Sequence, residues 1–207
     1  MEKNNINREM ERLGLIDIQK VVPTILSDVR YATPNNFTGK VLYKTSFGLY
    51  AVEALAKALE EMSAWMSRHF PEYKIVIFDA ARPLSVQREM FDLVKNTSFE
   101  SYIYNPYGKI PGGFHNYGLA LDLTLADSRG NLLDMGSEYD FFGTLSHSGK
   151  ERELLEDGQI TPEAYSNRLL LFSIAGRAGL FPHPQEWWHF QMSYDEDSKN
   201  NFPLLDF

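Results

Sequence analysis

Residues 114–125 read FHNYGLALDLTL, a stretch that alternates like a β-strand and carries two titratable side chains. Its leucines recur at every second position, which is the period of a strand with one buried face: Leu119, Leu121, Leu123 and Leu125. The opposite face carries small or polar residues: Gly118, Ala120, Asp122 and Thr124. The pattern therefore predicts a strand packed on one side, with open space above Asp122.

His115 precedes this strand, seven positions before Asp122. We place it on the loop that leads into the strand, with Gly118 as a bend or bulge between the two residues. A histidine and an aspartate so placed suit a metal site, but they suit an ordinary aspartate on an edge strand equally well. A further group must converge on the same space before the pattern indicates chemistry.

The composition narrows the classes of partner and site. The chain has 207 residues, 43% of them hydrophobic and 23% charged, which is typical of a soluble globular protein. A net charge of −8 with scattered Lys and Arg argues against a nucleic-acid partner. Cysteine is absent, so any metal must be held by His, Asp or Glu. No membrane span or leader is indicated, so we expect a cytoplasmic location, although a cysteine-free chain would also suit export.

The remaining pattern predicts helices around a sheet. An apolar stripe predicts a helix over about 47–69, with Ser46 as its cap, and Pro83 opens a second helix over 83–94. A third helix follows Thr161 and Pro162. Residues 73–79 and 186–192 are predicted strands. We therefore expect an α+β fold whose antiparallel or mixed central sheet is flanked by helices.

The strand EWWHF, residues 186–190, supplies the missing group. Two histidines and an aspartate are enough to hold a catalytic zinc with a fourth position open, which makes His189 a candidate ligand. Glu186 is then a candidate for the carboxylate that takes a proton from water. Strand parity puts Glu186 and His189 on opposite faces, so this arrangement needs a bulge or an irregular start to the strand. The alternative for His189 is a core histidine among aromatic residues.

Several motifs together resemble the zinc D-alanyl-D-alanine peptidases, and most closely their dipeptidase branch. HNYGLALD fits the family pattern H-x(6)-D, and EWWH fits E-x-x-H. VRYATPNNFTG (29–39), FDAARP (78–83) and LDMGSEYD (133–140) are also similar to that branch and occur in its order. The similarity covers about residues 15–195. It implies a single zinc peptidase domain over 1–207, with the D-Ala-D-Ala peptidase or hedgehog-like fold and the zinc site on the sheet.

The resemblance also implies residue roles. It implies one zinc per chain, held by three ligands: His115, Asp122 and His189. It places the catalytic base on Glu186 and a carbonyl-steadying arginine on Arg82, for which an ion pair with Asp79 is the alternative. Tyr31 and Asp140 are implied to recognise the free ammonium of a dipeptide. The family usually carries Ser two residues before the first zinc histidine, and Gly113 stands there in this chain, so one candidate partner of the ammonium is missing.

Three functions are compatible with these residues. The leading one is zinc-dependent hydrolysis of D-alanyl-D-alanine and related dipeptides. The second is a D,D- or L,D-carboxypeptidase acting on peptidoglycan peptides, and the third is a non-catalytic zinc-binding module. The sequence sets no oligomeric state. His69, His147 and His183 are expected at the surface, outside the site.

Overall fold

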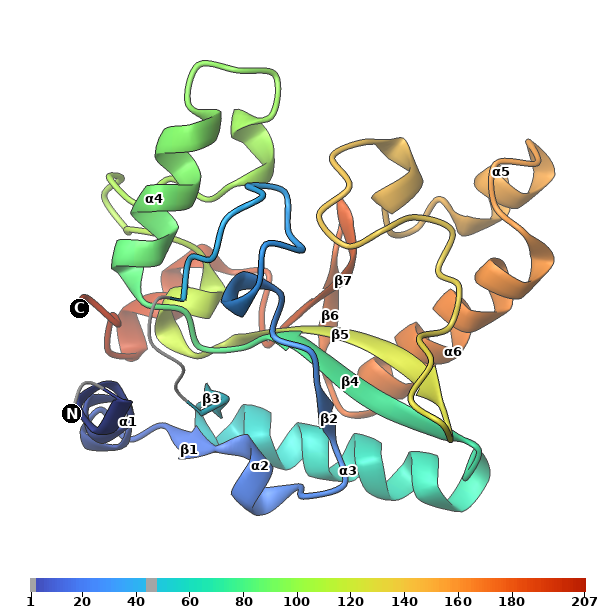
Figure 1. The fold of residues 1–207 in the computed structure, drawn as a ribbon, viewed down its shortest axis with the longest axis horizontal. Helices are drawn as coiled ribbons and strands as arrows, with labels where there is room; N and C mark the ends of the chain where they lie inside the picture. The colour runs from blue at the N-terminus through green and yellow to red at the C-terminus, as the bar shows by residue number, and fades with distance from the viewer. Residues whose placement is uncertain (1–2, 44–47) are drawn as a thin grey trace.

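The computed structural model describes residues 3–43 and 48–207 (Figure 1). Within these residues, five strands form one mixed sheet in the order β2-β4-β5-β7-β6. The strands are β2 (Leu26–Ser27), β4 (Tyr73–Asp79), β5 (Ala120–Asp127), β7 (Glu186–Gln191) and β6 (Phe181–His183). Strand β2 runs parallel to β4, and the other neighbours are antiparallel. The expected α+β class with a mixed sheet is confirmed.

Two long helices cover one face of this sheet. Helices α3 (Glu53–His69) and α6 (Pro162–Arg177) lie below the sheet in Figure 1 and contact each other, and α3 also contacts β4 while α6 contacts β5. Helix α4 (Leu84–Val94) and long connecting segments lie above the sheet. The upper face is therefore covered mainly by loops, which carry functional groups more often than core elements do.

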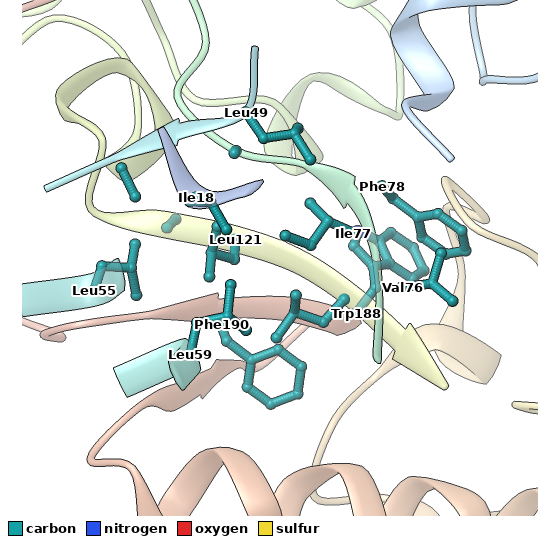
Figure 2. Packing of buried hydrophobic residues seen from close by; sticks show 14 of the residues in the cluster. Ile18, Leu49, Leu55, Leu59, Val76, Ile77, Phe78, Leu121, Trp188 and Phe190 are labelled. Carbon is teal, nitrogen blue, oxygen red and sulfur yellow. The ribbon is translucent and has the colours of Figure 1, made fainter. Parts of the chain in front are cut away.

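The leucines of β5 form the centre of the core. Leu121 pairs with Phe190 of β7, and Figure 2 shows both residues beside Leu55 and Leu59 of α3. All four leucines predicted for the buried face are at most 2% exposed. Asp122 on the opposite face is also only 2% exposed. The space above Asp122 is thus enclosed by the loops instead of being open to solvent.

The strand register brings polar residues together on the upper face. Asp122 of β5 lies opposite His189 of β7 and, on its other side, opposite Asp79 of β4. Residues directly opposite in antiparallel strands have Cβ atoms about 4.5–5.5 Å apart. The pairing of the central strands therefore places two candidate metal ligands side by side.

The predicted helix over 47–69 starts later than expected. Tyr50–Ala51 forms strand β3, which pairs with β1 (Ile16–Asp17), and α3 begins at Glu53. The expected cap Ser46 lies outside the described residues. The backbone before the helix bonds to neighbouring segments, because Ile18 N donates to Leu49 O and Val52 N donates to Gly118 O. These bonds favour extended chain over a further helical turn.

The other predicted helices are confirmed closely. Pro83 directly precedes α4, and Thr161 caps α6 by accepting a 3.0 Å hydrogen bond from Ala164 N. The remaining helical elements are short: α1 (Lys3–Arg12), α2 (Ile18–Val21), α5 (Glu151–Glu156), and the 3-10 turns η1 (Arg30–Ala32), η2 (Glu100–Tyr102), η3 (Phe114–Tyr117), η4 (Thr144–Ser146) and η5 (Glu196–Asn201). No helix in the described part of the chain is long and apolar enough to cross a membrane.

Candidate metal centre

A tight turn places His115 against the sheet. His115 lies on η3, and Gly118 ends this turn with φ of +67°, in the left-handed region. A Cβ at Gly118 would lie 2.8 Å from Leu15 Cδ2, so both the conformation and the space require glycine here. Arg82 N donates to His115 O, which fixes the turn beside the end of β4. The predicted bend at Gly118 is confirmed, and His115 lies on a 3-10 turn.

Three side-chain atoms converge at the centre of the site. His115 Nε2 lies 3.1 Å from Asp122 Oδ1 and 3.0 Å from His189 Nδ1. His189 Nδ1 lies 3.2 Å from the same Asp122 oxygen. All three residues are at most 4% exposed. They form the one cluster of three or more potential metal ligands found among the described residues, and it consists of the three ligands predicted from the sequence.

Hydrogen bonds on the far side of each imidazole fix which nitrogen faces the centre. His115 Nδ1 lies 2.7 Å from Ala80 O, which can only accept, so this nitrogen carries the proton. His189 Nε2 lies 3.0 Å from Gln191 Oε1, and Gln191 Nε2 donates to Ser193 O, which fixes the orientation of the amide. Both histidines therefore direct a lone pair toward Asp122.

This arrangement fits a zinc ion. Two lone pairs and a carboxylate oxygen would repel one another at these distances without a cation between them. Tetrahedral zinc ligands about 2.0–2.1 Å from the metal lie about 3.4 Å from one another, close to the observed separations. Asp122 suits the role as well, because its pKa is held well below the usual range: burial opposes ionisation, but the His115 and His189 imidazoles outweigh it. The outer oxygen of Asp122 accepts a 2.7 Å bond from Tyr139.

Glu186 reaches the same centre from the start of β7. Its Oε2 lies 3.7 Å from His189 Nδ1, although simple parity would put the two residues on opposite faces. The pairing of β6 with β7 shifts register between Pro182 and His183, and His183 lies opposite Glu186. The irregular start of the strand that the sequence required is therefore present. Burial raises the pKa of Glu186 well above its usual range, and the Asp122 and Asp140 carboxylates add to this shift.

Arg82 lies at the edge of the centre in a rigid setting. Its Nε and Nη2 lie 2.8 and 2.7 Å from Asp79 Oδ2, and Nη1 donates to Gln87 Oε1 at 2.8 Å. The ion pair with Asp79, which was the alternative to a catalytic role for Arg82, is therefore present. It does not remove Arg82 from the site, since Nη2 also lies 3.8 Å from Asp122 Oδ2. A guanidinium has five N–H donors, so these bonds do not exhaust it.

Tyr31 and Asp140 form a second polar pair near the centre. Tyr31 OH donates to Asp140 Oδ1 at 3.0 Å, and the Tyr31 ring lies 5.0 Å from the Arg82 guanidinium carbon. Asp140 has φ of +60°, a left-handed conformation uncommon for a non-glycine residue. Burial raises the pKa of Asp140 to about 7, against a bond from Phe37 N that lowers it. The structure brings both predicted residues together at the edge of the site.

Sequence reasoning missed several residues around the centre. The surface position expected for His183 is wrong: it is partly buried, its ring lies 5.3 Å from that of His189, and burial lowers its pKa to about 3. Gln191 and Tyr139 support the ligands through the bonds described above. Gln191 shares the parity of His189, which was a usable signal. Tyr139 lies in a loop, where no periodicity could have indicated it.

Comparison with known proteins assigns the family. A family model described as D-ala-D-ala dipeptidase matches residues 11–204. The D-alanyl-D-alanine dipeptidase of Escherichia coli (strain K12) is 30% identical over 194 residues, covering 92% of this chain and 89% of that protein. The chain belongs to the D-Ala-D-Ala dipeptidase family. It is therefore a peptidase.

A second dipeptidase is similar over most of this chain. The D-alanyl-D-alanine dipeptidase of Enterococcus faecium is 29% identical over 208 residues, covering 92% of this chain and 96% of that protein. Among solved structures, an LD-carboxypeptidase overlaps weakly, with a TM-score of 0.37, 18% identity, and coverage of 76% of this chain and 67% of the other. The span matched by the dipeptidase family contains every candidate site residue described above.

One position departs from the expected dipeptidase pattern. Gly113 precedes η3, and a Cβ built there would lie 2.6 Å from Tyr104 Cδ2. The Tyr104 ring also packs 6.1 Å from the ring of His183. In this family member an aromatic ring therefore occupies the space that a side chain at position 113 would need.

Proposed function

We propose that this chain hydrolyses D-alanyl-D-alanine and related dipeptides, with one zinc per chain bound by His115, Asp122 and His189. The observation that carries the proposal is the buried convergence of these three ligand atoms with Glu186 beside them. A purely structural zinc would use a fourth protein ligand, whereas a catalytic one keeps that position open. We also propose that residues 1–207 form a single peptidase domain.

The proposed chemistry needs a base, a positive charge and an ordered substrate. The zinc would supply Lewis acidity at the scissile carbonyl and lower the pKa of water at its open position. Glu186 takes the proton of the attacking water on its carboxylate and delivers it to the leaving nitrogen as the amide C–N bond breaks. Burial of Glu186 on one side of the site keeps this proton out of bulk solvent. The products are two free amino acids.

Arg82 is proposed to stabilise the charge that develops on the carbonyl oxygen. Asp79 and Gln87 hold its guanidinium in one orientation, so little reorganisation is needed during the reaction. Tyr43 OH donates to Asp79 Oδ1 at 2.6 Å, which fixes Asp79 in turn. The ion pair therefore positions the arginine.

Arg82→Lys tests this role. Lysine keeps the charge but cannot bond Asp79 and Gln87 together in the planar geometry of the guanidinium. We expect at least about a tenfold loss in kcat with a modest change in KM, as for an interaction made mainly in the transition state. Steady-state kinetics on D-alanyl-D-alanine measure the split. A raised KM with unchanged kcat would make Arg82 a ground-state anchor instead.

Asp140 and Tyr31 are proposed to recognise the free ammonium of the dipeptide. A half-buried carboxylate with a pKa of about 7 is ionised more fully when a cation binds beside it. Tyr31 OH and Phe37 N hold its two oxygens in place. This pair distinguishes a dipeptidase from a carboxypeptidase, which must accept a substrate without an ammonium at that position.

A pair of substrates tests the proposed function directly. We expect D-Ala-D-Ala to be hydrolysed with much higher kcat/KM than N-acetyl-D-Ala-D-Ala, because acylation removes the ammonium and leaves the half-buried Asp140 carboxylate without a cation beside it. Asp140→Asn should largely abolish this preference. Glu138→Gln is the matched control, since Glu138 is exposed in the same loop. Comparable hydrolysis of both substrates by the wild type would favour the carboxypeptidase.

A further inference from the structure

Four aromatic rings from three separate segments meet beside the loop that carries Asp140. The ring of Phe142 lies 5.0 Å from Phe37, 5.5 Å from Phe99 and 4.9 Å from Tyr102, on which it stacks at 18°. We call Phe37, Phe99, Tyr102 and Phe142 the aromatic clasp. It joins the loop after η1, the segment around η2 and the loop before η4, which are far apart in sequence. Phe142 is the ring common to all these contacts.

The clasp is built directly onto Asp140. Phe142 follows Asp140 by two residues, and Phe37 N donates to Asp140 Oδ2 at 3.1 Å while the Phe37 ring packs on Phe142. The two side chains Phe37 and Phe142 are partly buried and pack against the main core. The two rings therefore pack together directly beside the loop that carries Asp140 and beside the backbone N–H that bonds its carboxylate.

The other end of the clasp adjoins a cavity that reaches His183, a neighbour of the metal centre. Tyr102 lines a cavity of about 560 Å³ together with Tyr104 and His183, and the ring of His183 lies 5.3 Å from that of His189. Ser148 N donates to Pro184 O, so the loop that follows Phe142 is tied to the turn before Glu186. The clasp thus lies between the loop that carries the proposed ammonium anchor and a cavity lined by His183.

We propose that Phe142, supported by Phe37 and Tyr102, is a specificity-determining wall that stops the substrate at its amino end. This inference rests on the proposed function, in which Asp140 binds the ammonium of a dipeptide. A peptide with one more residue at its amino terminus would have to pass Asp140 and would meet the rings of Phe37 and Phe142. The wall discriminates against longer substrates, whereas Asp140 discriminates against substrates that lack the ammonium.

Two kinds of longer substrate separate these two effects. N-acetyl-D-Ala-D-Ala has lost the ammonium and is longer only by a small acetyl group, so the discrimination against it comes mainly from Asp140. The tripeptide L-Ala-D-Ala-D-Ala keeps an ammonium but carries it one residue further out. Discrimination against the tripeptide therefore depends on the room beyond Asp140 as well as on the distance between Asp140 and the displaced ammonium. Removing the Phe142 ring should relax this discrimination and leave D-Ala-D-Ala as a substrate.

The experiment compares Phe142→Ala with Phe141→Ala. Phe141 is the neighbouring residue, is 41% exposed and is not part of the clasp, so its removal controls for loss of an aromatic side chain in this loop. The measured quantity is kcat/KM for L-Ala-D-Ala-D-Ala divided by that for D-Ala-D-Ala. We expect this ratio to rise at least about tenfold in Phe142→Ala, the usual scale of discrimination by an apolar pocket. Phe141→Ala should keep the wild-type ratio.

The outcomes separate the wall from the proposed function. A wild type that cleaves D-Ala-D-Ala, with a Phe142→Ala variant whose ratio is unchanged, overturns the wall. A folded, zinc-loaded wild type that cleaves no dipeptide overturns the proposed function instead. Circular dichroism and the melting temperature check the fold of each variant. If Phe142→Ala does not fold, Phe142→Leu replaces it. Leucine keeps an apolar side chain but is smaller than phenylalanine, so the ratio of the two kcat/KM values should rise by a smaller factor.

Discussion

Glu186→Gln is expected to lower kcat on D-alanyl-D-alanine at least about a hundredfold while the protein keeps its zinc. Glutamine is nearly isosteric with glutamate but cannot take a proton at neutral pH, and general-base catalysis contributes about 10²–10⁴-fold. Glu186 Oε2 lies 3.7 Å from His189 Nδ1, beside the three converging atoms but outside their triangle. Steady-state kinetics and elemental analysis on the same preparation measure both quantities.

A matched control for this variant is Glu138→Gln, which changes an exposed glutamate and should leave both kcat and zinc content unchanged. The role of Glu186 is contradicted by two results. Loss of zinc in parallel with activity would reassign it as a ligand. Near-normal turnover by the zinc-loaded variant would show that Glu186 is not the general base.

His115→Ala and His189→Ala are each expected to lose most of the zinc and nearly all of the activity. Each removes one of three protein ligands and leaves the buried Asp122 carboxylate with only one of its two imidazole partners. Zinc content of protein purified without chelator measures the effect, and the expected value falls from about one per chain in the wild type. Added zinc should restore little activity, because only two of the three ligands remain to hold the metal in its catalytic position.

His69→Ala controls for loss of a histidine. His69 is exposed at the end of α3, where its ring packs 4.6 Å from that of Trp65. Its removal should leave zinc content and turnover unchanged. The proposed ligand set is wrong if the His115 and His189 variants retain full zinc, or if His69→Ala loses it.

The central strands could be predicted because their pattern reports their packing. The alternation of leucines in 119–125 fixed which residues face the helices, and so put Asp122 on the opposite face together with small residues. Hydrophobic periodicity is the strongest local signal of a strand. The pairing of Asp122 with His189 then follows once β7 lies beside β5, but strand order is a long-range property that periodicity alone did not give.

The supporting residues could not be predicted from local pattern because they act through long-range contacts. Tyr139 reaches Asp122 from a loop, and Gln87 reaches Arg82 from a helix face that periodicity assigns to the core. His183 looked like a surface residue because it stands between two prolines. The shifted register between β6 and β7 carries it inward, and the same shift turns Glu186 toward the centre.

The most direct test is a titration of metal-free protein with zinc, followed by release of D-alanine from D-alanyl-D-alanine. We expect no hydrolysis without metal, activity that rises in proportion to added zinc, and saturation at about one zinc per chain. The same titration of His115→Ala should stay flat. Full activity of the metal-free protein, or tight binding of one zinc without any hydrolysis of the dipeptide, would contradict a zinc dipeptidase built on this buried triad.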